Sequence, residues 1–336
     1  MSHLLPPSTF SMNNAPILEI LTQSRELAIV SHFRPDGDAI GSTLALGLAL
    51  INLGKRVHMW NEDAVPARYA FLEGAHLIRP VPDTLPGGVD ALICVDSGDL
   101  KRIGEQATAL FHQAARTANI DHHETNTHYA EANLVEGNAA ACGCVLFKLL
   151  QEMGAAITRP IANALYTAIS TDTGSFQYSS TTPEVMEIAA HLIRAGVDVG
   201  EINRRLYQEA PLSAFIMQRE VLNHMVVEEN GAISHYSMPA GKRAELSVGL
   251  EDTKDLVDII RVLAGVRVAI IFEDLENGLI RMSLRSKDPR ISVAEIASQF
   301  GGGGHAMAAG IRMRGELAEC REKVLQAIRA AVRKQP

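Results

Sequence analysis

Short apolar runs that alternate with helical stretches constrain the fold of this chain more than any other feature. Four such runs are typical of strands: 27–32, 55–60, 91–96 and 117–121. A helix is expected over 41–53, where Gly54 would end it. Apolar strands separated by helices favour a parallel sheet that is covered on both faces. The sequence therefore predicts an α/β fold with a doubly wound, mainly parallel sheet.

The second half of the chain has a different pattern. After expected helices over 139–153, 160–171 and 183–196, strands are expected over 232–239, 266–274 and 279–287, and helices over 253–264, 292–300 and 316–333. With 336 residues, the chain has about twice the length of one typical domain. We expect a first domain over 16–185, a helical linker over 186–211 and a smaller α/β domain over 212–333, with a site in the cleft between the domains.

Charge is distributed unevenly along the chain. Residues 1–185 hold 11 Lys and Arg against 19 Asp and Glu, whereas residues 186–336 hold 20 of each. The net charge of −8 argues against binding of a long nucleic acid, which requires a basic surface. An excess of acid in the first half instead indicates carboxylates gathered around metal.

Cysteine use and the N-terminus indicate the compartment. None of the four Cys residues forms a CxxC pair, so we expect reduced, structural thiols. The opening residues do not resemble a secretory leader, and the longest apolar stretch, 40–53, is too short to span a bilayer. The prediction is a cytoplasmic protein without a membrane partner; whether it is a monomer or a homodimer stays open.

Polar residues follow the predicted strands at the edge where ligands bind parallel sheets. They lie in four segments and include five acids: His32, Asp36 and Asp38; Asp96; Asp121, His122 and His123; and Asp172. So many carboxylates in one crevice raise one another's pKa unless a cation compensates them. Mixed carboxylate and imidazole ligands suit Mn²⁺, with Mg²⁺, Co²⁺ or Fe²⁺ as competitors. Because the ligands exceed the needs of one ion, we expect two metals and phosphoryl-transfer chemistry.

These segments resemble a known family. HFRPDGDAIGS, VDSGD, DHH at 121–123 and STDTGSF are similar to four successive motifs of the DHH phosphoesterases. GGGGHAMAAG at 301–310 resembles the signature of the DHH-associated domain in RecJ-like members. The compact two-domain layout is most similar to the bacterial group that degrades nanoRNA and 3′-phosphoadenosine 5′-phosphate (PAP).

The resemblance implies a role for each site residue. One Mn²⁺ would be held by His32, Asp36 and Asp96, and the other by Asp38, Asp96, His122 and Asp172, so that Asp96 bridges the two ions. His123 would face the substrate phosphate or the leaving oxygen, and Asp121 would orient the histidines.

The second domain offers residues for the substrate. Glycine costs about 0.5–1 kcal/mol relative to alanine, so packing is a poor explanation for four in a row. We expect Gly302, Gly303 and Gly304 to form a loop that binds an anion, with His305 as an added donor. Alternation along 281–287 places Arg281, Ser283, Arg285 and Lys287 on one strand face. The resemblance favours Arg285 as the phosphate ligand, whereas Arg281 and Lys287 are expected on the solvated surface.

The preferred function is Mn²⁺-dependent hydrolysis of very short single-stranded RNA to mononucleotides and of PAP to AMP. Two alternatives in the same class are a phosphodiesterase of linear or cyclic dinucleotides and a RecJ-like single-strand exonuclease. An alternative of another class is a non-catalytic nucleotide-binding module, against which the intact ligand set argues.

Overall fold

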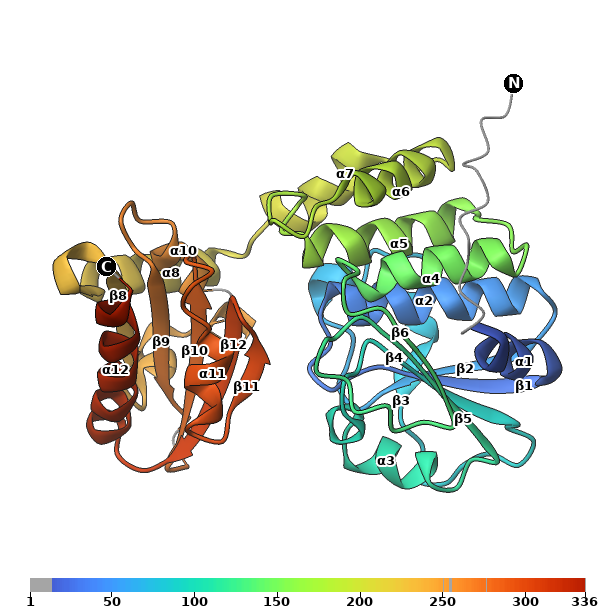
Figure 1. The fold of residues 1–336 in the computed structure, drawn as a ribbon, viewed down its shortest axis with the longest axis horizontal. Helices are drawn as coiled ribbons and strands as arrows, with labels where there is room; N and C mark the ends of the chain where they lie inside the picture. Colours follow the sequence, from blue (N-terminus) through green and yellow to red (C-terminus); the bar gives the residue numbers. More distant parts are fainter. Residues whose placement is uncertain (1–13, 250, 254–255, 276, 336) are drawn as a thin grey trace. The chain divides into compact units, whose positions relative to one another are not determined.

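The computed structural model describes residues 14–249, 251–253, 256–275 and 277–335 (Figure 1). The opening residues, and residues 254–255 of the predicted helix 253–264, lie outside this range. The chain divides into an N-terminal unit that ends at Glu209 and a C-terminal unit that starts at Ala210. No helix in the described ranges has the length and apolar character needed to cross a membrane.

The N-terminal unit contains a six-stranded sheet. Its strands are β1 (Glu26–Val30), β2 (Arg56–Asn61), β3 (Ile78–Pro80), β4 (Ala91–Val95), β5 (Arg116–Asp121) and β6 (Ala132–Val135). Every neighbouring pair is parallel, and the order is β3-β2-β1-β4-β5-β6. The predicted doubly wound parallel sheet is confirmed. The two edge strands, β3 and β6, are only three and four residues long and are not among the predicted strands.

Helices cover both faces of this sheet, as Figure 1 shows. One face packs against α1 (Ala15–Gln23), α2 (Gly37–Asn52) and α4 (Cys142–Glu152), and the other against α3 (Glu105–Phe111). Helix α5 (Arg159–Asp172) packs on α2 and α4, and α6 (Pro183–Arg194) packs on α5, outside the layer next to the sheet. Successive residues of β1 serve the two cores in turn: Leu27 and Ile29 face the first, Ala28 and Val30 the second. Residues of the predicted linker fold as α6, α7 (Val199–Asn203) and a π-helical turn (Arg204–Gln208), and belong to the N-terminal unit.

Helix α2 begins earlier than predicted. It starts at Gly37 instead of Gly41, because the side chain of Asp36 accepts hydrogen bonds from the backbone N–H groups of Asp38 and Ala39. This cap makes the Asp-Gly-Asp segment the first turn of a helix and brings Asp38 onto that helix.

The C-terminal unit contains a mixed six-stranded sheet of order β11-β12-β10-β9-β8-β7. Its strands are β7 (Val226–Glu228), β8 (Ile233–Met238), β9 (Val268–Asp274), β10 (Leu279–Ser286), β11 (Gly303–His305) and β12 (Ala308–Arg314). Only the β8–β9 pair is parallel. Helices α11 (Val293–Ser298) and α12 (Leu317–Lys334) cover one face, while α8 (Leu212–His224) and α10 (Leu256–Arg261) cover β8 and β9 on the other. The short helix α9 (Lys242–Leu246) follows β8.

The glycine-rich segment is the clearest local correction. The sequence predicts a loop at this segment, but Gly303–His305 form β11, which pairs with β12 at the edge of the sheet. Packing does explain two of the glycines. A Cβ on Gly302 would lie 2.3 Å from the carbonyl oxygen of Gly310, and one on Gly304 would lie 2.4 Å from that of Ala308. Gly303, by contrast, has nothing within 4 Å of its Cβ position.

The close contact of α2 with α5 yields a test of the fold. A Cβ on Gly41 would lie 2.4 Å from the backbone oxygen of Ala164, which cannot move without displacing α5. We expect Gly41→Val to lower the free energy of unfolding by about 2–3 kcal/mol. Gly87→Ala is the control, because its Cβ would meet open space, and it should change that free energy by less than about 0.5 kcal/mol. Denaturant unfolding followed by circular dichroism measures both, and equal stability of the two variants would contradict the expectation.

Candidate metal centre and substrate-binding residues

The fold brings the six predicted metal ligands together at the carboxyl edge of the parallel sheet. They come from five places along the chain: His32 follows β1, Asp36 and Asp38 open α2, Asp96 follows β4, His122 follows β5, and Asp172 ends α5. Strands β1 and β4 are neighbours at the point where the strand order reverses. A crevice forms outside the sheet at such a point, so the topology alone places His32 and Asp96 beside each other.

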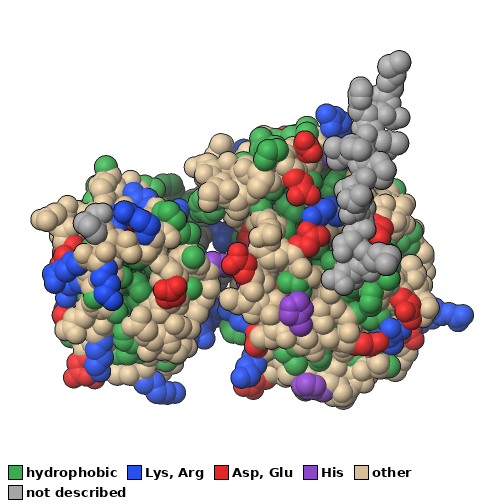
Figure 2. Space-filling model, in the orientation of Figure 1, with side chains coloured by type: hydrophobic (Ala, Val, Ile, Leu, Met, Phe, Trp, Pro, Cys, Tyr) green, Lys and Arg blue, Asp and Glu red, His purple; other side chains and the backbone are tan. Residues whose placement is uncertain are grey.

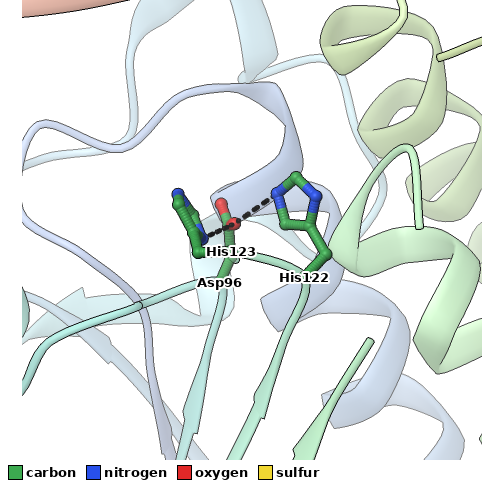
Figure 3. Close-up of side chains that lie close together, drawn as sticks. All are labelled: Asp96, His122 and His123. Atoms are coloured by element: carbon green, nitrogen blue, oxygen red, sulfur yellow. Dashed lines mark ion pairs between the residues drawn. The ribbon is translucent and has the colours of Figure 1, made fainter. Parts of the chain in front are cut away.

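Asp96 lies at the centre of the cluster. Its Oδ2 is 3.5 Å from Nε2 of His32, and its Oδ1 is 3.5 Å from Nε2 of His122. Figure 3 shows the second of these contacts, together with that to His123. The backbone of Asp96 has φ +52°, a left-handed conformation that is uncommon outside glycine and is often found at functional sites. The carboxylate thus faces two imidazoles, one with each oxygen.

The first candidate ligand group consists of His32, Asp36 and Asp96, whose ligand atoms lie within 4.8 Å of one another. Oδ1 of Asp36 caps α2, which leaves its Oδ2 to face Nε2 of His32 at 3.6 Å. Nδ1 of His32 lies 2.9 Å from the carbonyl oxygen of Phe33. A proton on Nδ1 would satisfy this contact and leave the lone pair of Nε2 for a cation.

The second candidate group consists of Asp38, His122 and Asp172, again within 4.8 Å. Nε2 of His122 is 3.7 Å from Oδ2 of Asp38 and 3.3 Å from Oδ2 of Asp172. Nδ1 of His122 lies 3.2 Å from the carbonyl oxygen of Ala139. Both histidines therefore direct Nε2 toward carboxylates and Nδ1 toward a backbone carbonyl.

Asp38 is held by donors that the sequence analysis did not identify. Its carboxylate accepts hydrogen bonds from the Ser42 hydroxyl (2.8 Å) and from the backbone N–H groups of Cys142 (2.6 Å) and Gly143 (3.0 Å). The two amides belong to the first turn of α4, where N–H groups lack partners within the helix. The small residues at 139–144 were the available signal, since they let this helix end approach the carboxylate closely.

His123 forms a third candidate ligand group with Asp96 and His122, but its Nδ1 lies closest to Asp121. That atom is 2.8 Å from Oδ1 of Asp121 and 3.9 Å from Oδ1 of Asp96. Oδ2 of Asp121 accepts a 2.6 Å hydrogen bond from Asn126, whose Nδ2 also contacts Oδ1 of the buried Asn119 at 2.7 Å. Asn126, which follows the histidine pair in sequence, is not among the predicted site residues. Its hydrogen bond fixes the position of Asp121, which in turn orients His123.

The ionisation of the cluster is unbalanced without a cation. Burial and the charge of Asp96 raise the pKa of Asp38 to about 7, and burial and the charge of Asp38 hold the pKa of Asp172 well above its usual range. Burial opposes the ionisation of Asp96, but hydrogen bonds with His122 and His32 keep its pKa well below normal. The pKa values of His32 and His122 are raised by the carboxylates despite burial. Protons thus compensate charges that a divalent cation would otherwise compensate.

The donor set fits divalent cations. Each group supplies an imidazole nitrogen and carboxylate oxygens, and Asp96 has one oxygen near the histidine of each group. Carboxylate and imidazole ligands together suit Mn²⁺ and similar first-row ions. The side chains could hold two ions, with Asp96 as their shared ligand.

The substrate-binding candidates of the C-terminal unit also come together. Register places Arg285 opposite Ala308 and Ala308 opposite His305 on three neighbouring strands. Residues directly opposite one another point their side chains to the same face of a sheet. Arg285 and His305 therefore flank the small side chain of Ala308. Nε of Arg285 is also 3.6 Å from Oδ1 of Asp258.

Arg281 is not on the solvated surface, contrary to expectation. It forms an ion pair with the buried carboxylate of Glu273 and donates a 2.7 Å hydrogen bond to Oγ1 of Thr253. The register of β9 and β10 explains this ion pair, because it places Arg281 directly opposite Glu273. Arg281, Glu273 and Arg285 line a cavity of about 150 Å³. Lys287 is exposed, as expected, and donates to the carbonyl oxygen of Leu263.

The raised pKa values yield a prediction for metal binding. Native Asp38 and Asp172 bind protons more tightly than in the unfolded chain, so their contribution to the stability of the metal-free protein falls as pH rises from about 4 to 7. A cation competes with these protons and with those of the histidines. We therefore expect the rise in Tm on adding MnCl₂ to be at least about twofold larger at pH 7.5 than at pH 5.5. Differential scanning fluorimetry of chelator-treated protein measures it. A larger rise at pH 5.5 would contradict the assignment of this cluster to metal.

Comparison with known proteins agrees with this geometry. Residues 26–169 match the DHH family, N-terminal domain, and residues 245–334 match the DHHA1 domain. The chain is 35% identical over 303 residues to the bifunctional oligoribonuclease and PAP phosphatase NrnA of Thermus thermophilus, covering 90% of this chain and 88% of that protein. It is 26% identical over 282 residues to the protein of the same name from Bacillus subtilis, covering 83% and 86%.

A solved structure extends the likeness to the whole chain. The crystal structure of an exopolyphosphatase-related protein from Bacteroides fragilis superposes with a TM-score of 0.85 at 25% identity, covering 96% of each chain. Together, the motifs, the sheet topology and these relatives show that the chain belongs to the DHH family of metal-dependent phosphoesterases.

Proposed function

We propose that this phosphoesterase uses two Mn²⁺ ions to hydrolyse very short RNA to mononucleotides and PAP to AMP. The observation that carries the proposal is the position of Asp96, whose two oxygens face the histidines of two separate ligand groups. The names of the Thermus and Bacillus relatives, which describe oligoribonuclease and PAP phosphatase activities, support the choice of substrates.

We assign the metal ligands as the sequence predicts. His32, Asp36 and Asp96 would hold one ion, and Asp38, Asp96, His122 and Asp172 the other. Mn²⁺ is preferred because imidazole accompanies the carboxylates in both groups; Mg²⁺ favours oxygen ligands alone. When bound, such a pair of ions activates a water for attack on phosphorus and neutralises charge on the phosphoryl oxygens.

His123 is assigned as the proton donor. Asp121 accepts a hydrogen bond from its Nδ1, so that Nε2 is the ring nitrogen directed to other partners. Although burial lowers the pKa of His123, the hydrogen bond to Asp121 and the charge of Asp96 raise it above its usual value. A raised pKa favours the protonated ring, which would give a proton to the leaving oxygen as the phosphorus–oxygen bond breaks.

The C-terminal unit is assigned to hold the rest of the substrate. Arg285 and His305 would bind a second phosphate, and the backbone of Gly302, Gly303 and Gly304 would approach the ligand. Gly303 supports this role, because nothing in the fold requires its missing side chain. An edge strand also presents backbone N–H groups that no neighbouring strand engages.

The distribution of cations favours short substrates. Near Arg285, the guanidinium groups of Arg267 and Arg290 both pair with Asp288, and Arg281 pairs with Glu273. Figure 2 shows Lys and Arg side chains interspersed with acidic and neutral ones over both units, without a continuous basic stripe on the face in view. Such a surface suits a few phosphates and not a long strand.

A substrate panel tests the proposal. With Mn²⁺, kcat/KM should be highest for RNAs of about two to four nucleotides and for PAP, and should fall as RNA length increases. Its salt slope should be no steeper than roughly −2, because each neutralised phosphate of a single strand contributes about −0.7. Asp96→Ala should abolish activity, whereas Asp83→Ala, at an exposed carboxylate, should not. If kcat/KM rises with RNA length up to twenty nucleotides, the protein is a RecJ-like exonuclease. If kcat/KM is highest for cyclic dinucleotides, the protein is a dinucleotide phosphodiesterase.

The role of Arg285 has its own test. Arg285→Ala should leave bound manganese unchanged, because Arg285 lies outside the ligand groups. Loss of a charge-assisted phosphate contact should lower kcat/KM for PAP by the equivalent of about 1.5–3 kcal/mol. Bis(p-nitrophenyl) phosphate, which has no second phosphate, should be hydrolysed at nearly the wild-type rate. Equal losses on the two substrates would contradict the assignment.

A further inference from the structure

The residues that follow the candidate metal ligand Asp172 have an unusual backbone conformation. Gly174, Ser175 and Phe176 have φ angles of +57°, +59° and +62°, so three successive residues adopt the left-handed conformation. Glycine adopts this conformation readily, whereas a bulky residue such as Phe176 rarely does. Backbone strain of this kind persists only where the surrounding structure imposes it, and it is concentrated at functional sites.

Thr173 imposes this turn from a fully buried position. Its hydroxyl accepts a 3.0 Å hydrogen bond from the backbone N–H of Phe176. Its carbonyl oxygen accepts two more, from the backbone N–H groups of Gln177 (2.9 Å) and Tyr178 (3.0 Å). The ring of Phe176 also packs on the buried ring of Tyr166, with 5.5 Å between the centroids. Together, these contacts hold a tight turn at the end of α5.

The turn lays the ring of Tyr178 on the backbone of Gly174. A Cβ on Gly174 would lie 2.4 Å from two ring carbons of Tyr178, so the ring contacts this residue directly. Tyr178 is nevertheless 43% exposed. Single exposed hydrophobic side chains are ordinary on a protein surface. A half-exposed ring that is fixed in place by a strained turn needs a further explanation, because core packing does not require it.

The ring of Tyr178 lies close to the candidate metal centre. Gly174, on which the ring rests, is two residues beyond Asp172. Their Cα atoms are therefore no more than about 7.6 Å apart. A nucleoside whose phosphate lies at the metal ligands extends over a similar distance to its base.

The chemistry of the proposed substrates indicates what the ring would contact. In PAP and in short RNA, the base is the part that is flat and has a π face. Aromatic side chains bind such bases by stacking, and stacking tolerates any sequence because every base has a π face. A ring that the backbone already fixes loses little conformational entropy when a base binds to it.

We propose that the ring of Tyr178 stacks against the base of the nucleoside attached to the scissile phosphate. This inference rests on the proposed function and adds a specificity-determining residue to it. Tyr178 makes the N-terminal unit prefer nucleotides over other phosphate esters, without a choice among bases. PAP and short RNA both use the contact, because each has a base next to the scissile phosphate.

A base-free analogue of PAP isolates the contact. The compound 1,4-anhydroribitol 3,5-bisphosphate retains the sugar and both phosphates but lacks the base. Tyr178→Ala should lower kcat/KM for PAP about tenfold, a loss typical of one stacked base, and should change kcat/KM for the analogue by less than about twofold. Tyr178→Leu, which keeps an apolar side chain over Gly174, should lose as much as Tyr178→Ala. Tyr178→Phe keeps the aromatic ring and should retain at least about half of the wild-type kcat/KM for PAP.

Two controls separate stacking from structural support of the metal centre. Bound manganese in the Tyr178 variants should equal that of the wild type, because Tyr178 lies outside the candidate ligand groups. Phe215→Ala removes a ring that is 55% exposed on α8 of the C-terminal unit, and it should change kcat/KM for neither substrate. Loss of manganese, equal loss on PAP and the analogue, or no loss with PAP would overturn the proposal. If the wild-type enzyme hydrolyses neither PAP nor short RNA, the proposed function itself fails, which is a distinct result.

Discussion

The N-terminal site depends on one buried carboxylate that two imidazoles keep ionised. Asp96 is almost fully buried, yet its contacts with His32 and His122 hold its pKa well below normal. An unpaired charge at this depth would be strongly unfavourable. The pKa values of the surrounding acids, Asp38 and Asp172, are shifted in the opposite direction, which favours their protonated forms. The fold therefore gathers more negative charge than the protein alone can stabilise, a condition that divalent cations resolve.

Backbone groups form a large part of the scaffold that supports this charge. Asp36 caps α2, the amides of α4 hold Asp38, and Asn126 with Asn119 braces Asp121. The contacts at the starts of α2 and α4 engage backbone N–H groups that have no partner within their own helices. The close approach of α2 and α5 at Gly41 joins the helix whose first turn contains Asp38 to the helix that ends with Asp172. Ligand geometry and core packing are thus coupled.

The C-terminal unit differs from this site, because its proposed ligand-binding face carries few side chains. Arg285 and His305 flank a face on which Ala308, Gly310 and Gly303 leave the backbone accessible. Two glycines of the motif are required by the pairing of β11 with β12, and Gly303 is not. Gly302 and Gly304 therefore have a structural role. The fold does not explain Gly303, which we assign to ligand binding.

The sequence by itself determined the parallel sheet, the four polar segments at its strand ends and the alternation that places Arg285 on one face of β10. These features are local: they follow from apolar periodicity and from residues adjacent in the chain. Only the tertiary structure decided that α4 amides hold Asp38, that Arg281 pairs with Glu273, and that the glycines form an edge strand. The first of these contacts joins residues distant in the chain, Asp38 and Cys142, and the other two join residues of neighbouring antiparallel strands. They depend on strand register and helix packing, which local sequence patterns do not specify.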